Sequence, residues 1–176
     1  MNNIFLGAFL LTFWAACQTP AAKQENTTAA SVTTDALALP FQASYSTQWT
    51  QDVSDQDLQV VLQSYKYWQD GDIKALVSLH ADTVLTNPSS GGTFTRTKAE
   101  LLDYWQKTRD SLSQVTIQMT SWHKMYAADK KEAFVVTWYK ETDVYKDGKV
   151  DSAEYHDISR IKNAKLTWYS SYRRPL

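Results

Sequence analysis

Apolar positions follow helical spacing in the segment that begins at Ser54. Ser54 suits an N-cap because its hydroxyl accepts a hydrogen bond from a free backbone N–H, and acidic residues follow it in the first turn. Gly71 fits the left-handed position at which many helices end. The pattern predicts a helix between Ser54 and Gly71, whose apolar side is formed by Leu58, Val61, Leu62, Tyr65 and Trp68.

Two further helices and two short extended segments follow. Asp72 caps a shorter helix that carries Leu76 and Leu79. The stretch TVLTNPSSGGTF predicts a short strand, broken by an Asn-Pro pair and two glycines, and a brief extended piece at Phe94. Thr97 and Glu100 have the spacing of a capping box. They open a third helix, with an apolar side formed by Leu101, Leu102, Trp105 and Leu112.

After residue 112 the apolar period changes from about 3.6 residues to 2. Val115, Ile117 and Met119 alternate with polar residues, and residues 133–142 form a second β-rich run. Asp-Gly at 147–148 and Asn-Ala at 163–164 are hairpin turns leading into residues 150–161 and 166–172. Three N-terminal helices followed by an antiparallel meander predict an α+β domain. Such a sheet, curled around the helices, encloses a cone with one open end.

The N-terminus has the pattern of an export signal. Residues 4–16 are apolar, and thirteen residues span roughly 20 Å, whereas a bilayer core needs about 30 Å. This length favours a secretory segment over a membrane span, and a buried core helix is the alternative. Ala15-Ala16-Cys17 resembles the lipobox of bacterial lipoproteins, in which the cysteine is acylated. We therefore predict a signal peptide at 1–16, a flexible tether at 17–44 and a domain at 45–176.

The resemblance implies that acylated Cys17 anchors the chain to a lipid bilayer, since acyl chains such as palmitate add membrane affinity with each buried methylene. The residue after the cysteine is Gln18 rather than an acidic residue, which favours the outer membrane, facing the periplasm. The chain carries 18 basic and 19 acidic residues, so there is no electrostatic case for a nucleic-acid partner. Three histidines and a single cysteine argue against a structural zinc site, and no cofactor is expected.

The stretches QDGDIKALVSLHADTVLTNP and YHDISRIKNAKLTWYS carry a family resemblance. The pairs Gly71-Asp72 and Ala81-Asp82, and Arg160 followed by a turn at residues 163–166, resemble the nuclear transport factor 2-like (NTF2-like) superfamily of the SnoaL-like sort. Ala164 stands where that pattern has glycine. The match covers residues 54–174 and implies a conical α+β fold with a pocket, often in a homodimer. YSTQW, DYWQKTRDSL and DVYKDGKVDSAEYHD further resemble exported proteins of the Bacteroidetes.

Ketosteroid isomerases of this superfamily use a tyrosine on the first helix, an aspartate base and a protonated aspartate. Aligned through Gly71-Asp72, the tyrosine position falls at Ser64 and the base at Asn87, whereas the protonated aspartate falls at Asp157. An amide does not abstract a proton at neutral pH, and serine is a weaker donor than tyrosine. The alignment therefore argues against steroid isomerisation by this route.

Candidate ligand-binding residues are aromatic or lie beside aromatic positions. Their spacing fits a core, but aromatic side chains also line pockets for flat or apolar ligands. His80 closes the second helix, and Arg109 on the third helix would pair with a carboxylate ligand or with a neighbouring acidic residue. The candidates are Tyr65, Trp68, His80, Trp105, Arg109, Trp138 and Trp168.

Candidate acid–base residues lie on the predicted strands. His156 and Asp157 are neighbours on one strand, so they point to opposite faces and only one of them faces the cone. His123 shares parity with the apolar residues 115, 117 and 119 and faces inward unless a bulge intervenes. For each histidine a structural role is the stronger interpretation.

These observations support three hypotheses. The first is a membrane-anchored, non-catalytic domain that binds a small apolar or aromatic ligand in its conical pocket. The second is an isomerase or dehydratase that uses Asp157 or a pocket histidine as acid or base. The third is a subunit of an envelope protein complex, or a homodimer, formed through the exposed face of the sheet.

Overall fold

The computed structural model describes residues 39–176, and its compact unit spans Phe41–Leu176. The predicted signal peptide at 1–16, the predicted lipidation site Cys17 and most of the predicted tether at 17–44 lie outside the described residues. No helix within residues 39–176 is both long enough and apolar enough to cross a membrane.

The first helix, α1 (Asp55–Asp70), begins and ends where the sequence predicts. The hydroxyl of Ser54 accepts a hydrogen bond from the backbone N–H of Asp57 at 3.0 Å. Gly71 follows the helix with a φ of 78°, a left-handed conformation that glycine adopts without steric cost. Both predicted caps are confirmed.

The two shorter helices also have their predicted caps. The side chain of Asp72 accepts a hydrogen bond at the start of α2 (Ile73–Ser78). Thr97 and Glu100 form a reciprocal capping box at the start of α3 (Lys98–Asp110). Because these bonds satisfy backbone N–H groups that a helix leaves free, they fix the first turn of each helix.

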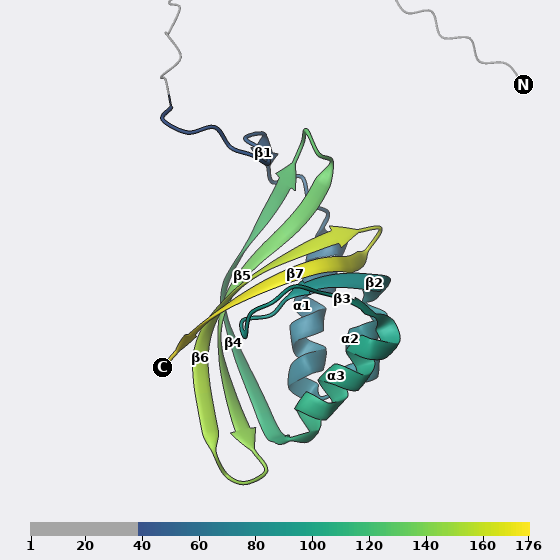
Figure 1. Ribbon diagram of the computed structural model, residues 1–176, viewed down its shortest axis with the longest axis vertical. Coiled ribbons are helices and arrows are strands. Elements are labelled where there is room, and N and C mark those ends of the chain that lie inside the picture. The colour runs from purple at the N-terminus through teal and green to yellow at the C-terminus, as the bar shows by residue number, and fades with distance from the viewer. Residues whose placement is uncertain (1–38) are drawn as a thin grey trace, which may run out of the picture. The chain divides into compact units, whose positions relative to one another are not determined.

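Seven strands form one sheet in the order β1-β4-β5-β6-β7-β2-β3. Each neighbouring pair is antiparallel except β2 and β7, which are parallel. The long strands β4 to β7 bend together, and the three helices lie on one side of them (Figure 1). The strands are β1 (Trp49–Thr50), β2 (His80–Asn87), β3 (Phe94–Thr97), β4 (Leu112–Ala127), β5 (Glu132–Tyr145), β6 (Val150–Lys162) and β7 (Lys165–Pro175).

The three helices are not the first elements of the domain, because a short strand that the sequence pattern does not predict, β1, precedes α1. β2 and β3 lie between α2 and α3, where the two extended segments are predicted. β2 lies inside the sheet between β7 and β3, while β3 and β1 are its outermost strands, β1 pairing with the end of β4. Leu112, expected on the apolar side of the third helix, is the first residue of β4.

A β-bulge in β4 changes which side chains face the helices. Met119 pairs with Tyr139 but Ser121 pairs with Trp138, so the strand carries one extra residue between them. Residues opposite one another in a sheet share a face. Residues 115, 117 and 119 therefore share the face of Tyr139, whereas His123, beyond the bulge, lies on the other face.

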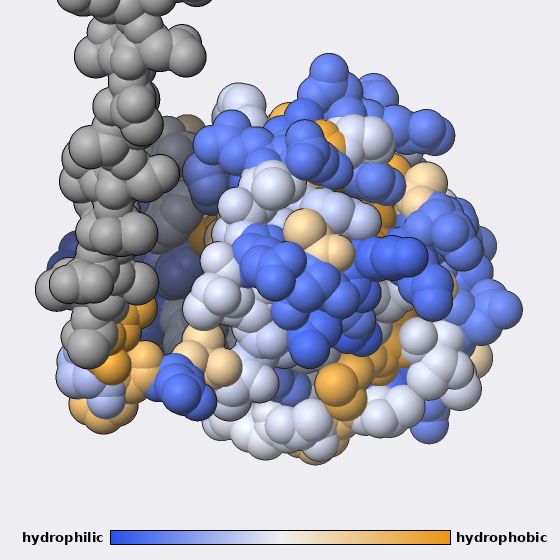
Figure 2. All heavy atoms as spheres, turned by 90° about the horizontal axis from the view of Figure 1, so that it is seen from above, coloured by the Kyte–Doolittle hydropathy of each residue, from blue (hydrophilic) through white to orange (hydrophobic). Residues whose placement is uncertain are grey.

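Two apolar clusters form the core. One joins α1 to the sheet through Val53, Val61, Val135, Ile161 and Leu166. The other joins α2 and α3 to β2 through Ile73, Leu76, Val77, Val84 and Leu101. On the face seen in Figure 2, hydrophobic residues appear as separate patches between hydrophilic ones.

Candidate functional site

A cavity of about 190 Å³ lies between the helices and the inner face of β5, β6 and β7. It borders both apolar clusters, through Leu166 of the first and Leu76 of the second. Six aromatic side chains line it: Tyr65, Trp68, Trp105, Tyr139, Tyr155 and Tyr169. Its polar groups include Glu141, Asp157 and His80.

Asp157 forms the centre of a hydrogen-bond network in the cavity wall. Its Oδ2 accepts hydrogen bonds from the hydroxyls of Tyr65 at 3.1 Å and Tyr139 at 2.9 Å. The Tyr65 hydroxyl also shares a hydrogen bond of 2.7 Å with the hydroxyl of Thr137. Burial raises the pKa of Asp157, and the surrounding hydroxyls oppose that shift. The rings of Tyr65 and Tyr139 lie 4.9 Å apart, and Tyr139 in turn stacks on Tyr155.

Glu141 is a second buried carboxyl group, and the candidates chosen from the sequence do not include it. Its side chain reaches the cavity from β5, where Oε1 accepts a hydrogen bond of 3.2 Å from the indole N–H of Trp68. Burial, together with repulsion from the nearby carboxyl of Asp143, raises the pKa of Glu141 to about 8. Glu141 therefore holds its proton at neutral pH when the cavity is empty.

His80, the first residue of β2, is buried and uncharged. Its Nδ1 lies 3.0 Å from the carbonyl oxygen of Leu76 and must carry the proton, because a carbonyl only accepts. Burial lowers the pKa of His80 to about 4 despite that hydrogen bond. The ring packs edge-on against Trp105 at 5.0 Å. Nε2 of His80 is consequently an acceptor.

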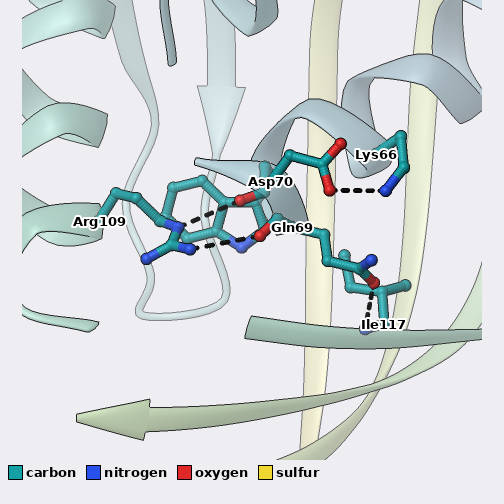
Figure 3. Close-up of polar contacts among 6 residues, drawn as sticks. Lys66, Gln69, Asp70, Arg109 and Ile117 are labelled. Carbon is teal, nitrogen blue, oxygen red and sulfur yellow. Dashed lines mark hydrogen bonds and ion pairs between the residues drawn. The ribbon is translucent and has the colours of Figure 1, made fainter. Parts of the chain in front are cut away.

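Arg109 lies outside the cavity and holds the end of α1 in place. Its guanidinium donates hydrogen bonds to the carbonyl oxygens of Trp68 at 3.3 Å, Gln69 at 3.3 Å and Leu112 at 3.2 Å. Figure 3 shows the side chain reaching from α3 to the last turn of α1, where Lys66 also pairs with Asp70. The last carbonyls of a helix lack partners within it, so a cation there satisfies them. This explains why Arg109, expected to meet a carboxylate, instead binds backbone.

The other candidates lie on the opposite face of the sheet. Trp138 stacks on His156 at 5.1 Å, and both line an outer groove. Trp168 packs edge-on against Phe134. His123 is exposed on this face because of the bulge in β4. Of the ten candidate residues within the described part of the chain, the cavity thus brings together Tyr65, Trp68, His80, Trp105 and Asp157. Asn87, at the end of β2, does not line it.

The groups that can carry a charge in the cavity at pH 7 are both acidic. Among the described residues, no Lys or Arg side chain lines it, and its only histidine is neutral at pH 7. Its two carboxyl groups are either neutral or negative. An anionic ligand would therefore meet no counter-charge in this cavity, and Arg109, for which a carboxylate ligand was one of two suggested partners, does not line it.

A comparison with families of related sequences matches residues 61–169 to the SnoaL-like domain. The chain belongs to the SnoaL-like domain family. The matched segment runs from α1 to β7 and contains every residue that lines the cavity except Ser171. Proteins of SnoaL-like and NTF2-like fold include ligand-binding proteins, isomerases, cyclases and hydrolases. A comparison with curated proteins finds no significant match.

Solved structures show the same NTF2-like cone. AusH from Aspergillus nidulans is 15% identical, with a TM-score of 0.56 over 69% of this chain and 86% of its own. A ketosteroid isomerase-like protein from Catenulispora acidiphila, solved with trimethylamine, is 16% identical, with a TM-score of 0.54 over 65% of this chain and 84% of its own. An LEH-like epoxide hydrolase from Mycobacterium tuberculosis is 8% identical, with a TM-score of 0.57 over 68% of this chain and 83% of its own. At these identities the likeness shows the fold alone.

The structure corrects the residue alignment used for the isomerase comparison. Ser64, aligned with the catalytic tyrosine, donates its hydroxyl to the carbonyl oxygen of Val61 in its own helix. The next residue, Tyr65, is the one whose hydroxyl reaches Asp157. A tyrosine therefore does meet Asp157 in this SnoaL-like domain, one position later along α1.

Proposed function

We propose that this domain binds a small, mostly apolar molecule in the aromatic cavity and that binding, rather than chemistry, is its primary function. The cavity itself supports this. Its volume of about 190 Å³ exceeds the roughly 150 Å³ that lets an apolar cavity hold a benzene ring. Ligand sites commonly combine apolar walls with a few convergent polar groups, and here those groups are Glu141, Asp157 and His80.

The surroundings of Asp157 support a binding role over proton transfer by this residue. The side chain is 8% exposed, and one of its oxygens already accepts two tyrosine hydroxyls. A general base must reach a substrate proton within about 3 Å. Asp157 is held inside the wall of the cavity, where it orients Tyr65 and Tyr139.

A fragment screen with a matched pair of variants tests the proposal. Ser171 lines the cavity and Ser121 lies on the outer side of β4, so Ser171→Phe fills the cavity while Ser121→Phe adds the same ring elsewhere. Neutral, cationic and anionic fragments of about one ring are screened by ligand-observed NMR and thermal shift. We expect binders that the wild type and Ser121→Phe retain and Ser171→Phe loses. No binders, or binders indifferent to Ser171→Phe, would reject the proposal.

The position and the pKa of Glu141 support acid–base catalysis as a second candidate function. Its side chain reaches the cavity, and a pKa of about 8 lies near the value that suits a general acid at neutral pH. Carbonyl compounds found in the screen are incubated with the protein in D₂O, and deuterium uptake at the carbon beside the carbonyl is followed by NMR. Catalysis predicts uptake that Glu141→Gln abolishes while binding persists. Binding without uptake in every case rejects this function.

We also propose that the chain is exported and anchored through acylated Cys17. The support is the apolar run at residues 4–16 directly before the only cysteine in the sequence. The full chain, expressed in a bacterium that processes lipoproteins and fed an alkynyl fatty acid, should take up label in the membrane fraction. Cys17→Ala should abolish both labelling and membrane association. Equal labelling of the variant would exclude this anchor.

A further inference from the structure

Each of the two carboxyl groups of the cavity accepts hydrogen bonds through one of its oxygens. Oε1 of Glu141 faces the indole N–H of Trp68, and Oδ2 of Asp157 faces the hydroxyls of Tyr65 and Tyr139. Donors aimed at carboxyl oxygens stabilise the ionised form. These donors favour the ionised form, whereas burial of both groups and, for Glu141, the nearby carboxyl of Asp143 oppose it.

No cation of the protein fills that role. Within residues 39–176, no Lys, Arg or His side chain forms an ion pair with Glu141 or Asp157. In the same part of the chain, Oδ1 of Asp157 is buried without a hydrogen-bond partner. A buried charge is costly unless it is paired. An ionised carboxyl group in this cavity therefore needs a positive partner that residues 39–176 do not supply.

The groups that face Glu141 are mainly acidic or phenolic. On β5 Asp143 adds negative charge, on β6 Asp157 does the same, and Tyr155 lies nearby. Burial raises the pKa of Asp143, and two arginines oppose that rise. They are Arg109 of α3, which is engaged with backbone carbonyls, and Arg173 of β7, which pairs with Asp151. Neither arginine lines the cavity.

We infer that the ligand of this cavity is a small organic cation, an amine or quaternary ammonium, held by the aromatic walls and by ionised Glu141, with the carboxyl group of Asp157 behind them in the cavity wall. The faces of aromatic rings attract cations, and the attraction is stronger when the cation is desolvated. The positive charge supplies the partner that both carboxyl groups lack, and the apolar substituents of the ligand fill the space between the rings. This inference rests on the proposed function and adds the charge of the ligand to it.

Choline and its neutral carbon isostere, 3,3-dimethylbutan-1-ol, test this inference because they share a shape and differ in charge. Binding of each is measured by titration calorimetry between pH 6 and 9. Cation binding must displace the proton of Glu141, so the dissociation constant of choline should fall by about tenfold per pH unit up to about pH 8 and then level off. The isostere should bind at least tenfold more weakly than choline at pH 8, without this pH dependence.

Glu141→Gln should weaken choline binding at pH 8 by at least tenfold, abolish its pH dependence and leave the isostere unaffected. Glu154→Gln, which removes a carboxylate from the outer groove, is the matched control and should change neither the binding of choline nor that of the isostere. Choline that binds no better than its isostere, or with no change between pH 6 and 8, overturns the inference. In that case, neutral fragments that bind the wild type but not Ser171→Phe would still support the proposed function. If no compound binds at all, both the proposed function and this inference are rejected.

Discussion

Replacement of Glu141 by glutamine should stabilise the protein, and by more as the pH rises. The pKa of Glu141 is 4.5 in an unfolded chain and about 8 in the folded protein. Because the folded pKa is raised, the stability present below pH 4.5 is lost progressively as the pH rises through 8. Glutamine has the same shape and keeps an oxygen for the indole N–H of Trp68, but it does not titrate.

The size of the effect follows from that difference in pKa. Each pH unit corresponds to about 1.4 kcal/mol, so the wild type loses about 3.5 kcal/mol between pH 4.5 and 7, and about 5 kcal/mol by pH 8. These values are upper limits, because a folded protein relaxes and admits water around a new buried charge. The unfolding free energy of Glu141→Gln minus that of the wild type should therefore rise with pH and level off above pH 8.

Urea unfolding at pH 5, 6, 7, 8 and 9, followed by tryptophan fluorescence, measures this difference directly. Exposed carboxyl groups also make the unfolding free energy depend on pH, but they are the same in both proteins, so their contributions cancel when one free energy is subtracted from the other. Glu154→Gln, which alters a half-exposed ion pair with Arg174, should run parallel to the wild type throughout. If Glu141→Gln also ran parallel to the wild type, Glu141 would not be a neutral buried acid and the reasoning would be refuted.

Three further substitutions probe other parts of the structure. His80→Gln should remove a loss of stability that the wild type suffers as the pH falls from 6.5 to 4, which amounts to at most about 3.4 kcal/mol. The loss arises because the imidazole is protonated more readily in the unfolded chain than in the folded protein. Acid unfolding curves of the two proteins measure the difference. Trp68→Phe removes the N–H that lowers the pKa of Glu141, so that pKa should rise above 8 in a carboxyl-labelled NMR titration, and an unchanged value would contradict the hydrogen bond. Ala164→Gly should raise the free energy of unfolding by about 1 kcal/mol, since Ala164 has a φ of 55°, and no gain in denaturant midpoint would count against strain there.

The local elements were predictable because their determinants are adjacent in the sequence. Each helix has a cap within three residues of its first turn, and the long strands begin or end at turns that need positive φ, as at Asn163 and Ala164. The order of the strands depends on contacts between distant segments. Pairing of β2 with β7 joins residues about 80 positions apart, and no local pattern encodes it.

The site was less predictable because side-chain direction depends on register. The bulge in β4 turns His123 outward, although its parity with Met119 suggested otherwise. Glu141 could have been found from its strand, since it continues the alternation of Val135, Thr137 and Tyr139 on the inner face. An acidic residue at an inward position of a buried strand is the pattern to look for. The aromatic candidates divided between the faces for the same reason.

At one position on the rim of the sheet, a side chain of the same molecule takes the place that a strand from another copy would occupy. Its outermost strands, β1 and β3, are only 2 and 4 residues long. Further along β4, the backbone N–H of Ile117 donates to the side-chain oxygen of Gln69 on α1 at 2.9 Å (Figure 3). Free strand margins recruit strands from neighbouring molecules and so promote aggregation. By occupying that N–H, Gln69 blocks the pairing of a further strand at this position of β4.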